Sequence, residues 1–167
     1  MGEQANLGRD ESIQKIRHIA KGEIAMMHTF EGREMGIVRP MGTAGVDDDG
    51  TIWFMSQAGS PKNEQARGDQ AMQITYSLKS TSEYLVLNGQ AEVLRDQTKI
   101  DELWSFIDKT WFPEGKEDPS IRLIRFSPRV GHYWDTKHNK VVQLLGMAAG
   151  AVTGKAADDG VEGELRP

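Results

Sequence analysis

A series of short apolar runs between residues 24 and 93 constrains the fold of this chain more than any other feature. The runs read EIAMMHTF, MGIVRPM, TIWFMS, AMQITYSL and EYLVLNGQAEVL. Turn-forming segments such as EGRE, DDDG and KSTS lie between them. Strand-length runs divided by turn signals are typical of an antiparallel sheet or barrel, whereas a doubly wound parallel sheet needs a helix between successive strands.

Helical periodicity marks segments on both sides of these strands, at residues 10–21, 98–112 and 140–152. Two further strand candidates, IRLIRFSP and VGHYWD, precede the last of these helices. The expected fold is therefore mainly β (α+β), a compact antiparallel barrel with flanking helices.

The predicted domain covers residues 10–154 and follows a flexible N-terminus of residues 1–9. Residues 155–167, KAADDGVEGELRP, have no hydrophobic period and are predicted to be a disordered tail. A chain of 167 residues can bury roughly two-thirds of its unfolded surface in one such domain.

The acidic segment DDDG at residues 47–50 has two interpretations. A calcium loop would need regularly spaced oxygen ligands and a distant glutamate, and this segment lacks both. A hairpin turn is therefore the preferred interpretation.

Charge and composition exclude several classes of partner. The net charge of −5 and the isoelectric point near 5.4 disfavour nucleic acid or an anionic membrane, because both require a basic surface. The chain has no cysteine, so disulfides and thiolate chemistry are excluded, and a reducing cytoplasm is the expected compartment. The start lacks the apolar segment of a secretory signal, and the apolar run at 141–152 is too short to span a bilayer.

The usual catalytic motifs are missing from the sequence. It has no G-x-S-x-G, G-x-G-x-x-G or Walker segment, and nothing pairs Glu83 with Glu92 as acid and base. The four histidines lack the spacing of a helical metal site, so no metal is predicted. The remaining polar residues are suited to holding a cofactor that supplies its own reactivity.

The segment SQAGSPKNEQ at residues 56–65 carries the first candidate binding site. An apolar strand ends there and helix-compatible residues follow. Ser60 can cap such a helix, Pro61 fits its first turn, and Lys62 can reach a phosphate from that position. The alternative interpretation is an ordinary capped helix with a solvated lysine.

Arg39 is the second candidate, because it lies inside the apolar run GIVRPM. Pro40 lacks a backbone donor, so the run is expected at a sheet edge or at a bulge. The arginine can point to solvent or face the same cavity as Lys62. In the second case two cations would meet one phosphate.

Trp134 is the third candidate. It lies in HYWD, at the end of a predicted strand and next to polar residues. An indole in that position is suited to covering a flat aromatic ligand.

These motifs, taken in order, resemble those of a known family. The segments are GIVRPM, TIWFMSQAGSPKNEQ, YLVLNGQAEVLRD, DELWSFIDKTWFPEG and HYWDTKHNKVVQLL. Their order and spacing resemble the general stress protein 26 family, a branch of the pyridoxamine 5′-phosphate oxidase-like FMN-binding split barrels. The resemblance covers roughly residues 10 to 155.

The resemblance implies an antiparallel six-stranded split β-barrel that forms a homodimer and binds FMN, or FAD as an alternative, in clefts between subunits. By the same resemblance, Arg39 and Lys62 contact the flavin phosphate, Ser60 lies near it, and Met55 and Ser56 line the flavin. Trp134 would lie by the ring system, in many relatives from the partner chain. The residues implied to bind the cofactor are Arg39, Pro40, Met41, Met55, Ser56, Ser60, Lys62 and Trp134.

The chain departs from true pyridoxamine phosphate oxidases in two places. Pro61-Lys62 replaces an Arg-Lys pair, and no arginine occurs between Arg129 and Arg166, where those enzymes read the vitamin. The leading hypothesis is thus a cytoplasmic, FMN-binding general stress protein, a flavin-dependent oxidoreductase of unknown substrate with NAD(P)H as a potential reductant. A non-catalytic flavin-storage module and a true pyridoxamine phosphate oxidase stay open as alternatives.

Overall fold

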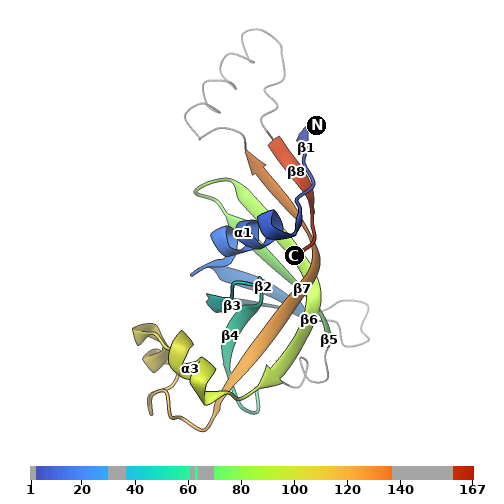
Figure 1. Ribbon diagram of the computed structural model, residues 1–167. Coiled ribbons are helices and arrows are strands. Elements are labelled where there is room, and N and C mark those ends of the chain that lie inside the picture. Colours follow the sequence, from blue (N-terminus) through green and yellow to red (C-terminus); the bar gives the residue numbers. More distant parts are fainter. Residues whose placement is uncertain (1–2, 30–36, 61–62, 64–69, 137–159) are drawn as a thin grey trace.

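The computed structural model describes residues 3–29, 37–60, 63, 70–136 and 160–167. Six antiparallel strands follow one another in the order β7–β4–β3–β2–β5–β6, and β6 pairs back onto β7 to close a barrel (Figure 1). The strands are β2 (Ile24–Thr29), β3 (Ile37–Val46), β4 (Ile52–Gln57), β5 (Gln70–Leu78), β6 (Glu83–Leu94) and β7 (Ile121–Thr136). The prediction of a mainly β, six-stranded antiparallel barrel is confirmed.

Alternation of apolar and polar residues determines which side of each strand faces the barrel core. In β6, Leu85 and Leu87 are fully buried, whereas Tyr84, which precedes Leu85, is exposed on the other face. The core gathers buried side chains from the six barrel strands and from helix α1 (Arg9–Ala20), which packs Ile16 and Ile19 against them. Burial of such aliphatic side chains is the main stabilising contribution to a barrel of this kind.

β7 is one continuous strand, although the sequence predicted two. The first predicted strand, IRLIRFSP, ends at Pro128, a residue that cannot donate to a ladder. In the structure Pro128 pairs with Gly89 of β6, where the register shifts between Asn88 and Gly89. A Cβ on Gly89 would lie 2.2 Å from the carbonyl oxygen of Ser127, so only glycine permits this close crossing.

A second, smaller core lies outside the barrel, on β4 and the first part of β7. Helix α3 (Gln97–Leu103) and the short 3₁₀ helix η1 (Phe106–Thr110) follow β6 along the chain. The helical segment predicted at 98–112 is thus divided into two pieces. The residues that form this outer cluster are Trp53, Ile100, Phe112, Ile121 and Leu123.

The DDDG segment forms the hairpin turn between β3 and β4, as predicted. Val46 pairs with Ile52, and Asp47 N–H donates to the carbonyl of Thr51 at 2.9 Å. Gly50 has a φ of 87°, a left-handed conformation that glycine adopts without strain.

The chain ends differ from the prediction. Residues 160–165 form strand β8 (Gly160–Leu165), which pairs antiparallel with the end of β7, and β1 (Glu3–Gln4) pairs parallel with β8 (Figure 1). Disorder was therefore the wrong prediction for Gly160–Leu165, and Glu3–Gln4 is likewise held in the sheet. The signal was weak because β8 has two apolar side chains that reach the core, Val161 and Leu165, and glycines and glutamates fill the rest of the strand. The helix predicted at 140–152 lies outside the described residues.

Candidate functional site

The barrel is split between β3 and β4. These strands pair at Val46–Ile52, Gly45–Trp53 and Thr43–Phe54, with a bulge between Thr43 and Gly45. Beyond that point β3 pairs with β2, and the end of β4 pairs with β7. Among the pairings of the described residues, none joins 37–42 to 55–57. The two strands separate at the position where the sequence predicted the phosphate-binding residues.

Arg39 lies on the inner side of β3 at this split. It pairs with Met27, a fully buried core residue of β2, and paired residues share one face of a sheet. Arg39 is partly buried, and Met41, two residues along, is 7% exposed within the core. The side chain of Pro40 points to the outer side. At this position the described pairing of β3 is with β2 alone, so the missing backbone N–H is tolerated.

Ser56 and Asn63 hold the corner that follows β4. Both side chains belong to residues only 2% exposed, and Ser56 Oγ donates to Asn63 Oδ1 at 2.5 Å. Asn63 Nδ2 donates to the carbonyl oxygen of Gln57 at 2.7 Å. Backbone bonds from Ser60 N–H to Gln57 and from Asn63 N–H to Ser60 complete the turn. The corner is therefore fixed by buried hydrogen bonds, not only by chain direction.

Asn63 is a site residue that the sequence did not single out. Asparagine is so frequent in turns that its presence in SPKN gave no separate signal. Pro61 and Lys62 lie outside the described residues, so the role of Lys62 stays a prediction.

Met55 and Ser56 point to opposite sides of β4. Met55 pairs with Leu123 and packs against the outer cluster beneath α3. Ser56 lies two residues beyond Phe54, on the inner side, and Met41 lies two residues before Thr43 on that same side. The split thus brings Arg39, Met41 and Ser56 onto one face and leaves the side chain of Met55 on the other.

Trp134 lies on the outer wall of the barrel. It pairs with Tyr84 of β6 and Glu162 of β8, and it is 39% exposed. Its ring centroid is 4.5 Å from that of His132, whose Nε2 lies 3.5 Å from Glu162 Oε2. Trp134 therefore does not share the inner face with Arg39 and Ser56 of the same chain.

The outer wall has a groove of about 430 Å³ that includes His132, the residue whose ring lies against Trp134. Val86, Asn88 and Val130 of the two long strands line it, together with His132 and Glu164. His132 is thus the residue that lines the groove and also contacts the indole.

A buried hydrogen bond lies next to the split. The hydroxyl groups of Thr43 and Tyr76 are 2.8 Å apart, and Tyr76 is fully buried. Burial raises the pKa of the Tyr76 hydroxyl, and the hydrogen bond to Thr43 opposes this shift only in part. The phenol therefore stays neutral. Its hydrogen bond to Thr43 helps to hold the Thr43–Phe54 pair, at which β3 and β4 begin to separate.

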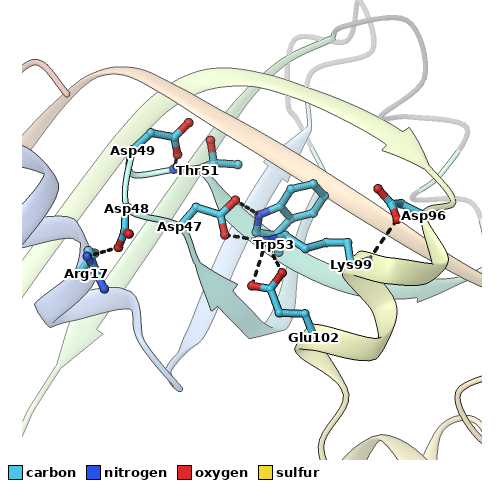
Figure 2. A network of polar contacts seen from close by, with 9 residues as sticks. All are labelled: Arg17, Asp47, Asp48, Asp49, Thr51, Trp53, Asp96, Lys99 and Glu102. Atoms are coloured by element: carbon cyan, nitrogen blue, oxygen red, sulfur yellow. Dashed lines mark hydrogen bonds and ion pairs between the residues drawn. The ribbon is translucent and has the colours of Figure 1, made fainter.

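A polar network fixes α3 to the β3–β4 hairpin (Figure 2). Lys99 Nζ lies 2.8 Å from Asp47 Oδ1, 3.0 Å from Glu102 Oε2 and 5.1 Å from the centroid of the Trp53 ring. Trp53 Nε1 donates to the other oxygen of Asp47 at 2.8 Å. Burial alone would lower the pKa of Lys99, but hydrogen bonds to Asp47 and Glu102 outweigh it and raise that pKa. We assign this network a structural role, because its members bond to one another and so hold α3 on the hairpin.

Glu83 and Glu92 lie at opposite ends of β6. Glu83 is buried and contacts His18 Nε2 at 3.2 Å, whereas Glu92 is exposed and pairs with Arg125. The two carboxylates cannot act on one substrate atom as acid and base.

The barrel that opens between β3 and β4, with an arginine on its inner face and a hydrogen-bonded corner at its rim, places the protein in the split-barrel class. The chain belongs to the pyridoxamine 5′-phosphate oxidase like family, whose model matches residues 11–158. The family predicted from the sequence is confirmed. Across the described residues, no helix is long and apolar enough to cross a membrane.

Three proteins illustrate the similarity. The chain is 26% identical to general stress protein 26 from Jannaschia sp. CCS1. The match covers 94% of this chain and 97% of that chain, with a TM-score of 0.78. The general stress FMN/FAD binding protein from Xanthomonas citri is 21% identical over 77% of this chain and 90% of its own, with a TM-score of 0.66, which shows the shared fold. Protein bli-3 of Neurospora crassa is 25% identical over 92% of this chain and 81% of that protein.

Proposed function

We propose that the protein binds FMN at the β3–β4 split and acts as a flavin-dependent oxidoreductase of the general stress type. The observation that carries the proposal is the separation of β3 from β4, with the partly buried Arg39 on one strand and the corner held by Ser56 and Asn63 on the other. The molecule carries a net charge of −5, so an anionic cofactor needs local cations of this kind.

The proposed phosphate partners are Arg39, from β3, and Lys62, from the sequence that follows the corner. A charge-assisted hydrogen bond of this type contributes about 1.5–3 kcal/mol. Ser60 lies at the corner, where its N–H already donates to Gln57, and adds a hydroxyl donor, while Pro40 and Met41 shape the opposite strand. Ser56 donates its hydroxyl proton to Asn63, so its part is to hold the corner. Met55 packs beneath α3, so its contribution to a flavin site comes from its main chain.

The proposed assembly is a homodimer. Trp134 and Tyr84 are paired and exposed on the outer wall formed by β7 and β6, whereas Ile24, Met26 and Val38 are exposed on β2 and β3, across the barrel. Exposed large side chains that lie side by side, as Trp134 and Tyr84 do, indicate a contact surface. A second copy covering this wall would bring its own Trp134 to the split, where an indole can lie against a flat ring and exclude water.

The bound flavin would supply hydride or electron transfer, so no side-chain nucleophile is needed. The residues of this chain bind the phosphate, orient the ring and limit the access of water. NAD(P)H is the proposed reductant, and the proposed compartment is the cytoplasm.

Stopped-flow reduction of the flavin-loaded protein by NADH and NADPH tests the catalytic part of the proposal. We expect reduction faster than that of free FMN under the same conditions. A rate equal to that of free FMN would favour the second candidate, a flavin-binding module without turnover.

The true vitamin oxidase is a further alternative, and the sequence between Arg129 and Arg166 argues against it because it holds no arginine. Incubation with pyridoxamine phosphate is expected to yield no pyridoxal phosphate at enzymatic rates.

A further inference from the structure

The β3–β4 ladder of the described residues ends at the pair Thr43–Phe54. Continued in the same antiparallel register, the ladder would reach Pro40 on β3 and Gln57 on β4 three residues further on. No described pairing joins the two strands there. The backbone groups of Pro40 and Gln57 show why the ladder stops.

The backbone of Pro40 faces the split. In an antiparallel strand, the N–H and C=O groups of successive residues point to alternate edges. Thr43 N–H donates to the carbonyl of Glu23, beside β2, at 3.0 Å. Odd-numbered positions in this part of β3 therefore point their backbone groups to β2, and even-numbered positions point theirs to β4. A residue at position 40 would aim its N–H at β4, and proline has no N–H to offer.

The backbone of Gln57 faces the same gap from the other strand. The carbonyl of Thr51, at the start of the hairpin, accepts from Asp47 N–H on the β3 side at 2.9 Å. Ala58 N–H donates to the carbonyl of Ser120, on the β7 side, at 2.6 Å. By the same alternation, both bonds direct the backbone groups of Gln57 toward β3.

The carbonyl oxygen of Gln57 is already occupied from the corner. It accepts from Ser60 N–H at 3.1 Å and from Asn63 Nδ2 at 2.7 Å. A carbonyl oxygen has two lone pairs, so both are used. The rung between positions 40 and 57 is thus blocked twice, because Pro40 brings no donor and Gln57 has no free acceptor.

Closure of this rung would fill the proposed site. It would join about 10 Å more of the two strands, from Thr43 back to Pro40. The corner would then lie against the stretch of β3 that carries Arg39, where the flavin phosphate is proposed to bind.

We infer that Pro40 and Asn63 are positioning residues that keep the split open, the first by removing a donor and the second by occupying an acceptor. The gap then exists before the cofactor arrives, and no ladder bond has to break on binding. The inference rests on the proposed function for the identity of the ligand, whereas the open ladder can be tested without any ligand.

The experiment compares five forms of the full-length protein: the wild type, Pro40→Ala, Asn63→Ala, the double variant and Pro128→Ala. Pro128 is the matched control, because it is a proline inside the β6–β7 ladder and away from the split. Amide hydrogen exchange of the apo protein, followed by NMR, reports the ladder. The dissociation constant for FMN reports the site.

In Pro40→Ala the new amide at position 40 meets an occupied carbonyl, so we expect it to exchange fast. In the double variant one lone pair of Gln57 is free, and that amide should exchange about three- to tenfold more slowly. The FMN dissociation constant of the double variant should exceed the product of the two single effects by at least about threefold. Pro128→Ala should change neither the exchange of Gln57 nor the binding of FMN.

The same comparison in a Ser56→Ala background guards against poor folding of Asn63→Ala. In that background no buried hydroxyl loses its partner when Asn63 is replaced. The cycle can therefore be completed with folded proteins.

Fast exchange at position 40 in the double variant would overturn the inference and leave the proposed function intact. An FMN dissociation constant equal to the product of the single effects would do the same. A wild type that binds no FMN would contradict the proposed function, and the exchange rates would still decide whether the two residues keep the ladder open.

Discussion

At the scale of single residues, Asn63 uses both ends of its side-chain amide to hold the corner of the candidate site. Its amide oxygen accepts from buried Ser56 and its amide nitrogen donates to Gln57. Asn63→Ala leaves the Ser56 hydroxyl buried without this partner, so we expect a loss of about 1–3 kcal/mol in the free energy of unfolding. Urea denaturation of the apo protein measures this loss.

The matched control is Asn88→Ala, because Asn88 accepts from Gln73 in an exposed pair. Asn88→Ala should lower the free energy of unfolding by no more than about 0.5 kcal/mol. In the double variant Ser56→Ala, Asn63→Ala, part of the lost stability should return, since no orphaned hydroxyl is left. A double variant that loses the sum of both single effects would show that the two side chains act independently.

The residues of the site were predictable to different degrees. Arg39 and Pro40 stood out because an arginine and a proline inside an apolar run break the composition of a strand. Asn63, Thr43 and Tyr76 gave no such signal, because their roles arise from contacts between segments far apart along the chain. The inner or outer direction of Met55 and Ser56 also depended on the register with β7.

At the scale of elements, the attachment of α3 to the β3–β4 hairpin depends on Lys99. Its ammonium group lies between two carboxylates and over the Trp53 ring, and its side chain is 15% exposed. We expect Lys99→Met to lower the free energy of unfolding by about 1–2 kcal/mol at neutral pH. Lys116→Met is the control, since Lys116 pairs with Asp101 in an exposed salt bridge and should matter little.

The same network predicts a pH dependence. Hydrogen bonds raise the pKa of Lys99 in the folded state above its ordinary value of 10.5. The stabilisation is therefore complete below pH 10.5 and is lost as the pH rises through the higher, folded-state pKa. The difference in stability between wild type and Lys99→Met should shrink in that alkaline range. A difference that stays constant with pH would show that the charge of Lys99 is not what stabilises α3.

The elements were largely predictable, and the misses have physical causes. The run EYLVLNGQAEVL coincides with β6 because its alternation continues through the bulge at Asn88 and Gly89. The prediction divided β7 into two strands at Pro128, a residue that fits a ladder only opposite such a bulge. β8 was missed because its stability comes from pairing with β7, not from a pattern of its own.

At the scale of the whole molecule, the proposed flavin site takes its parts from two chains. Arg39 lies on the inner side at the split and Trp134 on the outer wall, so one site would take each from a different subunit. Mixing Arg39→Ala subunits with Trp134→Ala subunits should therefore create heterodimers with one intact site. With random exchange, about a quarter of all sites should recover wild-type affinity for FMN. No recovery on mixing would place both residues in the same subunit's site or in none.

The dimer itself is tested by placing a charge on the outer wall. Tyr84→Lys should shift the protein toward monomer in sedimentation and weaken FMN binding, because a lysine beside Trp134 opposes burial of the wall. Trp111→Lys also replaces an exposed apolar residue, but it lies at the corner and should leave the dimer intact. A wild type that sediments as a monomer at micromolar concentration while binding FMN tightly would contradict the assembly.

The most direct measurement is a calorimetric titration of FMN into purified wild-type protein and into Arg39→Ala. We expect saturation at one FMN per chain for the wild type, and a dissociation constant raised about ten- to hundredfold in the variant. A wild type that binds no flavin, or a variant whose dissociation constant equals that of the wild type, would contradict it.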